Sequence, residues 1–276
     1  GACLSVVSQT KADNMFQITP SASAAKVIAN DNCFQVCFTD PNQGTVSADY
    51  IASKGLATKV AVIYNSSDAY SSGIYDNFKA EAAAKGLDLV ASEAFTGDSK
   101  QDFSSQLSKI KASGAELIFL PIYYQEASLI LSQAKNAGIT AKFFGCDGLD
   151  GLLNIENFDK SLAENVMLLT PFAANATDET TKKFVAAYNA KYDPSTLNQF
   201  AADAYDAVYI VKAAAEKAGV TGDMSVSDIC NALKGAMTEI TVDGVTGSGM
   251  TWKATGEVNK EPKAVKIENG EYQPMD

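Results

Sequence analysis

The chain has 276 residues, 46% of them hydrophobic, and its 22 basic residues are all lysine because neither arginine nor histidine occurs. Against 33 acidic residues this gives a net charge of -11, which disfavours nucleic-acid binding, since phosphate contacts need clustered lysine and arginine. The chain also lacks the commonest general base and the guanidinium fork that clamps carboxylates, so backbone N–H groups, hydroxyls or lysine must hold any anionic ligand group.

The first predicted elements are two short apolar strands followed by a helix. The runs 15–19 (MFQIT) and 33–38 (CFQVCF) have the apolar and aromatic character of strands. The helix is expected to begin at Thr39-Asp40-Pro41, because threonine is a good N-cap and proline fits the first helical turn. This helix is predicted to open a second lobe.

Strands and helices then alternate from residue 60 to residue 145. We expect strands at 60–65, 87–95, 116–121 and 142–145, and helices at about 71–85, 102–112 and 125–137. Each helix is followed by a glycine, which readily adopts the left-handed conformation of a helix C-terminus. This alternation predicts an α/β fold with a parallel, doubly wound sheet.

The C-terminal part begins in the same way and then changes character. A strand at 166–172 is followed by helices near 178–191, 199–218 and 226–236. The segments 247–258 and 263–272 are instead predicted to form paired strands with glycine turns. Three tyrosines at helical spacing are interpreted as core residues: Tyr188, Tyr205 and Tyr209.

Five cysteines are scattered along the chain, at Cys3, Cys33, Cys37, Cys146 and Cys230. We interpret them as mostly buried small hydrophobic residues. Cys33 and Cys37 lie in one predicted strand, where their Cα atoms would be about 13 Å apart, so we expect no disulfide between them. Without histidine or a CxxC motif the chain is predicted to have no metal site.

Hydroxyl, aromatic and acidic residues recur where the predicted strands end. They are Pro20-Ser21-Ala22-Ser23 after the first strand, Tyr70 after 60–65, Tyr123 and Tyr124 after 116–121, and Asp147 after 142–145. Ligands of open α/β sheets collect beyond the carboxyl ends of the strands, so these loops are predicted to line one pocket. Their chemistry suits a small zwitterion.

Taken in order, these segments resemble the branched-chain amino-acid-binding family of periplasmic solute-binding proteins. The motifs that carry the resemblance are MFQITPSASA, FQVCFTDPNQGTVSADYI, KVAVIYNSSDAYSSG, AELIFLPIYYQEA, FFGCDG, YDPSTLNQFAADAYDAVYIVKAA and GSGMTWKATGEV. The resemblance implies a two-lobe type I binding fold with doubly wound parallel sheets and a hinge. Lobe one would comprise 1–38 and 170–247, and lobe two 39–169 and 248–276.

The resemblance also implies a set of ligand-binding residues. Ser23, with Ser21 beside it, matches the hydroxyl group that grips the ligand carboxylate. Asp147 matches the acidic residue that receives the ligand ammonium, where the family often has glutamate. Tyr70 and Tyr123 match aromatic residues that close over the ligand from lobe two, whereas Tyr124 could equally face the core. A wall residue in lobe one is implied at Phe200.

The implied function is capture of a small amino acid, branched-chain or otherwise hydrophobic, between the two lobes and its delivery to the permease of an ABC importer. The location would be extracytoplasmic, either periplasmic or lipid-anchored at the outer face of the membrane. Family members normally carry further residues ahead of the point where this chain starts, so lobe one is expected to be incomplete without a missing N-terminal segment.

Two other classes of protein are alternatives to a transport receptor. An enzyme is disfavoured because the chain contains no GxSxG, no GxGxxG and no P-loop, and no cofactor is expected. The ligand-binding domain of a sensor or receptor with the same fold remains an alternative. The exact ligand also stays open, since polar Asn198 and Gln199 adjoin Phe200.

Overall fold

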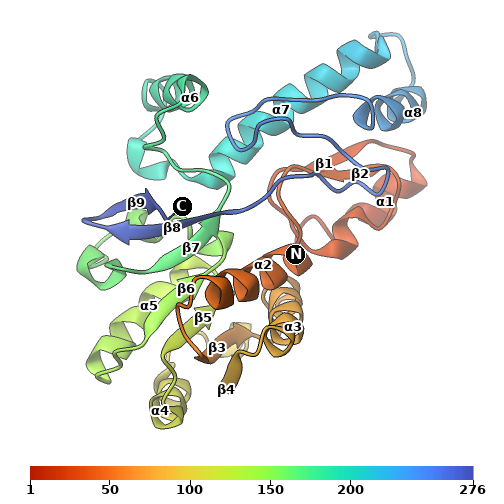
Figure 1. Cartoon of the computed structure of the whole chain (residues 1–276). Helices are drawn as coiled ribbons and strands as arrows, with labels where there is room; N and C mark the ends of the chain where they lie inside the picture. Colours follow the sequence, from red (N-terminus) through yellow and green to blue (C-terminus); the bar gives the residue numbers. More distant parts are fainter. Residues whose placement is uncertain (276) are drawn as a thin grey trace. The chain divides into compact units, whose positions relative to one another are not determined.

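A computed structural model describes residues 1–275, which divide into two compact units (Figure 1). Unit 1 comprises Gly1–Thr39 and Ala174–Glu261, and unit 2 comprises Asp40–Ala173 and the residues from Pro262 onward. The chain therefore passes from one unit to the other at three points. Two of these points lie close to the predicted boundaries after residues 38 and 169.

The third predicted boundary, after residue 247, differs from the structure, because 248–261 belongs to unit 1 rather than to the second lobe. Met250 forms a β-bridge with Val242. The Trp252 indole, 4% exposed, donates a hydrogen bond to the Gln35 carbonyl oxygen at 2.7 Å. These contacts attach the segment to unit 1, which its hairpin-like sequence did not indicate.

Unit 2 is built on a seven-stranded sheet with the order β4-β3-β5-β6-β7-β8-β9. The pairs from β4 to β7 are parallel, whereas β8 and β9 add an antiparallel hairpin. The strand bounds are β3 (Lys59–Asn65), β4 (Asp88–Phe95), β5 (Leu117–Leu120), β6 (Lys142–Gly145), β7 (Met167–Thr170), β8 (Lys263–Glu268) and β9 (Glu271–Pro274). The expected parallel, doubly wound sheet is confirmed here, and β8 and β9 confirm the predicted C-terminal hairpin.

Side chains alternate between the two faces of this sheet along each strand, as they must in pleated β-structure. In β3, Ala61 and Ile63 belong to one buried hydrophobic cluster, whereas Val60 and Val62 belong to another. The same alternation along several parallel strands gives unit 2 two separate cores. The sheet is therefore buried on both faces.

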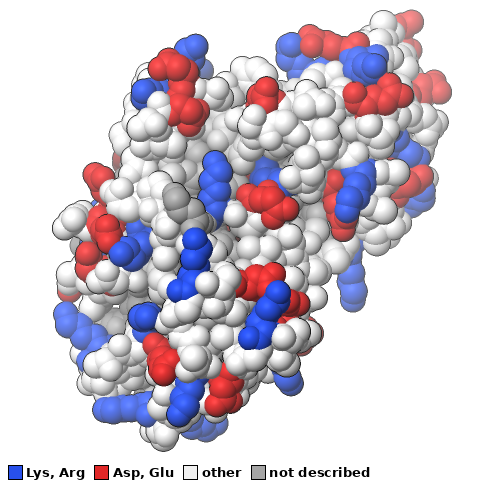
Figure 2. Space-filling model, viewed as in Figure 1, with Lys and Arg blue, Asp and Glu red and all other residues white. Residues whose placement is uncertain are grey.

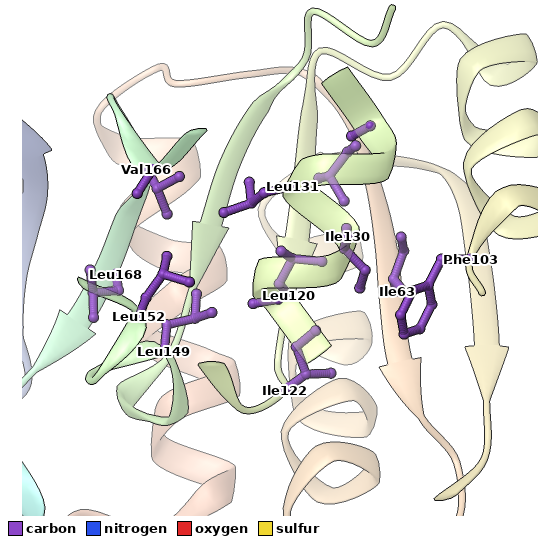
Figure 3. Packing of buried hydrophobic residues seen from close by; sticks show 14 of the residues in the cluster. Ile63, Phe103, Leu120, Ile122, Ile130, Leu131, Leu149, Leu152, Val166 and Leu168 are labelled. Carbon is purple, nitrogen blue, oxygen red and sulfur yellow. The ribbon is translucent and has the colours of Figure 1, made fainter. Parts of the chain in front are cut away.

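Helices cover both faces. α4 (Ser104–Ser113) and α5 (Tyr124–Asn136) contribute to the first core, where Figure 3 shows Ile130 and Leu131 packing over the strands. α2 (Asp40–Ser53) and α3 (Ala69–Ala84) contribute to the second core. The helices α3, α4 and α5 each begin and end within two residues of the predicted bounds, because the caps and glycines that mark helix ends are local signals.

In unit 1 the described residues form a two-stranded parallel sheet. Its elements are α1 (Val7–Ala12), β1 (Gln17–Thr19), β2 (Cys33–Gln35), α6 (Glu179–Asn189), α7 (Gln199–Ala218) and α8 (Val226–Met237). Residues of α7 and α8 share a core with Phe34 and Trp252. The segment 247–258, predicted to be a strand pair, contributes only isolated bridges to the described structure.

Two kinds of side chain test the expectations about burial. Cys33, Cys37, Cys146 and Cys230 are buried as predicted, and Cys3 is partly exposed. The prediction that Tyr205 and Tyr209 are core residues is wrong, since they are 39% and 49% exposed on α7, while Tyr188 is half-buried. Helical spacing places residues on one side of a helix but does not say which side faces the core.

The surface carries charges of both signs. On the face drawn in Figure 2, acidic and lysine side chains are interspersed. Charged side chains in both units form pairs, such as Lys109 with Glu93 at 2.8 Å in unit 2 and Lys212 with Glu216 at 2.7 Å in unit 1. Across residues 1–275, no helix combines the length and the apolar character needed to cross a membrane.

Candidate functional site

Three predicted residues of unit 2 lie where strands of its sheet end. Tyr70 is in the first turn of α3, after β3; Tyr123 precedes α5, after β5; and Asp147 follows β6. β3 pairs with β4 on one side and β5 on the other, so the strand order reverses there. The crevice beyond the carboxyl ends of strands at such a reversal is where open α/β sheets bind ligands.

Hydrogen bonds join Tyr70 to the loop that carries Asp147. The Tyr70 hydroxyl donates to Asp147 Oδ1 at 2.7 Å and accepts from the Gly148 backbone N–H at 2.9 Å. Only a glycine permits this approach, since a Cβ at residue 148 would lie 2.6 Å from the Tyr70 hydroxyl oxygen. The carboxylate is thus held in one orientation and is 3% exposed.

The Tyr70 ring stacks on the Tyr123 ring, with centroids 4.7 Å apart and planes 20° from parallel. Burial, and after it the Asp147 carboxylate, raises the pKa of Tyr70 well above its ordinary value. Burial also raises the pKa of Tyr123, and Asp68 and Asp147 add to the shift. Both hydroxyls are therefore neutral near pH 7, and the pair offers an aromatic surface beside a carboxylate, a combination that suits an ammonium group.

The third aromatic residue of this region, Tyr124, faces the other way. It is half-buried against the first core, and a Cβ at Gly151 would lie 3.2 Å from its ring. Of the two alternatives for Tyr124, these contacts support a side chain that faces the core.

Sequence reasoning missed Gln43. This residue is in the first turn of α2 and is fully buried, and its Oε1 accepts a hydrogen bond from the Asp147 N–H at 3.2 Å. Ser47 and Cys146 add a contact of 3.7 Å between α2 and the same loop. A polar residue on the inward face of a helix was the available signal, but its partner lies 104 residues away in the chain.

In unit 1, Ser21 and Ser23 lie in the turn after β1, and Ser23 is 3% exposed. The Thr19 hydroxyl oxygen accepts from the Ala22 N–H at 2.9 Å, and Gln35 Nε2 donates to the Ala22 carbonyl oxygen at 2.9 Å. Side chains therefore hold both backbone groups of Ala22, the residue between the two serines.

Phe200 lies on a different element of unit 1, in the first turn of α7. The Asn198 side chain caps this helix by accepting from the Ala201 N–H at 3.2 Å. The structure thus groups Tyr70, Tyr123 and Asp147 in unit 2 and places the two serines in one turn of unit 1, while Phe200 lies on a different element of that unit, α7. Within residues 1–275, no three or more cysteine or acidic side chains gather in a way that could hold a metal ion.

Comparison with known proteins shows which family this chain resembles. The model of the periplasmic binding protein family matches residues 1–271. The chain is 32% identical over 226 residues to Leu/Ile/Val-binding protein homolog 3 of Brucella melitensis, which covers 81% of this chain and 60% of that protein. It is 29% identical to the leucine-, isoleucine-, valine-, threonine- and alanine-binding protein of Pseudomonas aeruginosa, over 80% of this chain and 58% of that one.

A solved structure shows the same fold. The branched-chain amino acid transporter substrate-binding protein LivJ of Streptococcus pneumoniae, in complex with isoleucine, superposes with a TM-score of 0.85 at 28% identity. The match covers 99% of this chain and 75% of that one. The chain thus spans about 60% of the two curated relatives and three quarters of this solved structure.

Proposed function

Because the chain belongs to the periplasmic binding protein family, whose members are binding proteins and not enzymes, we propose that it binds a small amino acid with a branched or otherwise hydrophobic side chain. The relatives support this ligand class, since their names describe them as binding leucine, isoleucine and valine. The bound ligand would be delivered to the permease of an ABC importer.

The observation that carries the proposal is the arrangement of Tyr70, Tyr123 and Asp147. A buried carboxylate fixed by a tyrosine hydroxyl, with stacked rings beside it, suits a ligand that carries an ammonium group next to an apolar side chain. The ammonium end is assigned to Asp147. The carboxylate end is assigned to Ser21 and Ser23, because neutral hydroxyl and N–H donors can hold an anion in a chain without arginine.

The proposed location is extracytoplasmic, as the name of the family indicates. Both the periplasm and a lipid anchor at the outer face of the cell membrane are compatible with this proposal. Mass spectrometry of the protein isolated from membranes and from the periplasmic fraction distinguishes the two.

We also propose that a further stretch of chain completes the sheet of unit 1. Two strands are few for a stable sheet, and the outer edge of β1 is a template for another strand. Apolar side chains are exposed near it, with Val6 45% and Met15 43% accessible, and Val208 on α7 is 68% accessible. The greater length of the relatives supports this proposal.

The test of the amino-acid proposal is a calorimetric titration with L-leucine, L-isoleucine and L-valine, with D-glucose as the control solute. Binding should also raise the melting temperature, because a ligand at a hundredfold excess over its Kd adds about 2.7 kcal/mol of stability. The titration is run on this chain and on a version extended at its N-terminus. Binding of glucose, or of no amino acid by either version, would contradict the proposal.

A further inference from the structure

We propose that two fully buried glutamines, Gln35 in unit 1 and Gln43 in unit 2, are positioning residues of the amino-acid site. Each holds the backbone of one ligand loop through one atom of its side-chain amide. The inference rests on the proposed function, because it treats the loops that carry Ser21, Ser23 and Asp147 as ligand loops.

Gln43 is one of two anchors on the Asp147 loop. Its Oε1 accepts from the Asp147 N–H, and the Tyr70 hydroxyl accepts from the next N–H, that of Gly148. α2, which carries Gln43, lies very close to α3, which carries Tyr70, since a Cβ at Gly44 would be 2.4 Å from the Ile74 carbonyl oxygen. The two anchors are therefore held in a fixed relation to each other, and together they define where the carboxylate of Asp147 lies.

Gln35 plays the corresponding part in unit 1, with the opposite atom. Its Nε2 donates to the Ala22 carbonyl oxygen at 2.9 Å, at the centre of the turn that carries Ser21 and Ser23. The backbone of Gln35 is itself held firmly, because its N–H donates to the Gly256 carbonyl oxygen and its own carbonyl accepts from the Trp252 indole. A rigid strand end thus positions the turn.

The cost of burying these amides argues that they are present for a specific purpose. Gln35 and Gln43 are both 0% exposed, and in the described part of the chain Gln35 Oε1 and Gln43 Nε2 make no hydrogen bond. Burying an amide with one end unsatisfied costs free energy, so an apolar residue would fill the space at lower cost. The single bond that each amide does make, to a ligand loop, is the feature an apolar residue cannot supply.

Gln133 on α5 provides the contrast. Its Oε1 accepts from the Phe103 N–H at 2.7 Å and its Nε2 donates to the Gln101 carbonyl oxygen at 2.9 Å. Both ends of this amide are used to hold a segment outside the ligand loops. Gln133 is therefore the matched control, a glutamine with a structural role only.

The opposite use of the two amides predicts opposite responses to the same substitution. Gln43→Glu keeps an oxygen that accepts from the Asp147 N–H, so this loop should stay in place. Gln35→Glu replaces the donor with an oxygen that faces the Ala22 carbonyl, so that turn should loosen. The near-isosteric variants Gln43→Met and Gln35→Met remove both amide atoms and should loosen each loop.

The experiment combines hydrogen exchange with calorimetric titration of L-leucine and L-isoleucine on the protein and its variants. Gln43→Met should speed exchange of the Asp147 amide, and Gln35→Met and Gln35→Glu that of the Ala22 amide, each by about tenfold or more, while other amides keep their rates. Affinity should fall about tenfold in these three variants and hold in Gln43→Glu. Gln133→Met should lower the melting temperature with affinity unchanged.

The possible failures are distinct. If the unsubstituted protein binds amino acids but the loop amides and the affinity of the methionine variants are unchanged, the glutamine proposal is overturned alone. The same holds if affinity falls only in proportion to melting temperature, as in a general loss of stability. If the unsubstituted protein binds no amino acid, either as this chain or in the version extended at its N-terminus, the proposed function is overturned, and the assignment of these glutamines to an amino-acid site falls with it.

Discussion

At the scale of single residues, the site of unit 2 depends on how one carboxylate is held. Asp147 is almost completely buried, and its orientation is set by the Tyr70 hydroxyl on one oxygen and by Gln43 on its backbone. Because a nearby opposite charge favours the ionised form of a carboxylate, the proposed ligand ammonium suits this group. Two predictions follow from this arrangement.

Asp147→Asn removes the charge but keeps the shape of the side chain. We expect the Kd for leucine or isoleucine to rise roughly 30- to 1,000-fold, since losing one partner of a buried charge pair costs about 2–4 kcal/mol. The melting temperature without ligand should change little. Asp98→Asn, at an exposed position, is the control, and an unchanged Kd in Asp147→Asn would remove the ammonium assignment.

Tyr70→Phe keeps the ring stacked on Tyr123 but deletes the hydroxyl that joins Asp147 to Gly148. The Gly148 N–H loses its acceptor, so urea unfolding should show a loss of about 1–2 kcal/mol of stability, with affinity weakened severalfold. Tyr123→Phe alters a side chain that is 40% exposed and should cost less stability. Equal effects in both variants would argue against the hydroxyl as the link.

At the scale of elements, the site of unit 2 depends on the close packing of α2 against α3. Gly44 makes this approach possible, because the backbone of α3 occupies the space where a side chain would be. The glycine brings the first turn of α2, with Gln43, to the Asp147 loop. The packing of two helices is thus directly connected to the geometry of the Asp147 loop.

A pair of glycine-to-alanine substitutions tests this connection. In Gly44→Ala the new Cβ would lie 2.4 Å from the Ile74 carbonyl oxygen and 2.7 Å from the Phe78 nitrogen, so the helices must separate. We expect a loss of roughly 2–4 kcal/mol in urea unfolding, because overpacking of a close contact is costly. Gly235 lies inside α8, where an added Cβ would have no heavy atom of another element within 4 Å. Gly235→Ala should therefore raise the free energy of unfolding by about 0.5–1 kcal/mol. Similar effects at both positions would show that the contact is not tight.

At the scale of the whole molecule, a buried ionic network lies just before the third passage between the units. Lys260 Nζ lies 3.1 Å from Asp203 Oδ1 on α7 and also bonds to the Thr246 hydroxyl. Asp206 accepts from the N–H groups of Val245 and Thr246, each at 2.8 Å. The network ties the segment 248–261 to α7 and explains why this segment belongs to unit 1.

The network also predicts a pH dependence of stability. Burial raises the pKa of Asp203 from 3.8 to about 6, and the nearby Lys260 only partly opposes the shift. A raised carboxyl pKa means that the folded state holds its proton longer than the unfolded state does. The contribution of Asp203 to stability is therefore full below pH 3.8 and is lost as the pH rises to about 6.

Asp203→Asn should remove this dependence. The free energy of unfolding of the unsubstituted protein relative to the variant, measured in urea at pH 4, 5, 6 and 7, should fall up to about pH 6 and then level off. Asp159→Asn is the control of opposite sign, because hydrogen bonds from Ser161 lower the pKa of that carboxyl. If the free energy of unfolding of the unsubstituted protein, relative to Asp203→Asn, instead increased with pH, the raised pKa of Asp203 would be contradicted.

Much of the fold could be predicted from the sequence because its signals are local. Glycines after helices, the Thr39-Asp40-Pro41 start and apolar runs of strand length each act within a few residues of where they stand in the chain. The loops of Tyr70, Tyr123 and Asp147 could be grouped in advance for the same reason, since the carboxyl ends of neighbouring parallel strands meet at one edge of a sheet.

What only the tertiary structure decided involves partners that are distant in the chain. Gln35, Gln43, the Asp203–Lys260 pair and the placement of 248–261 all depend on contacts between separate elements, as does the exposure of Tyr205 and Tyr209. The sequence by itself therefore determined the order of elements, the α/β class and the loops that carry the candidate ligand residues. The packing determined which buried polar groups hold those loops in place, because a hydrogen bond between segments far apart in the chain leaves no local pattern.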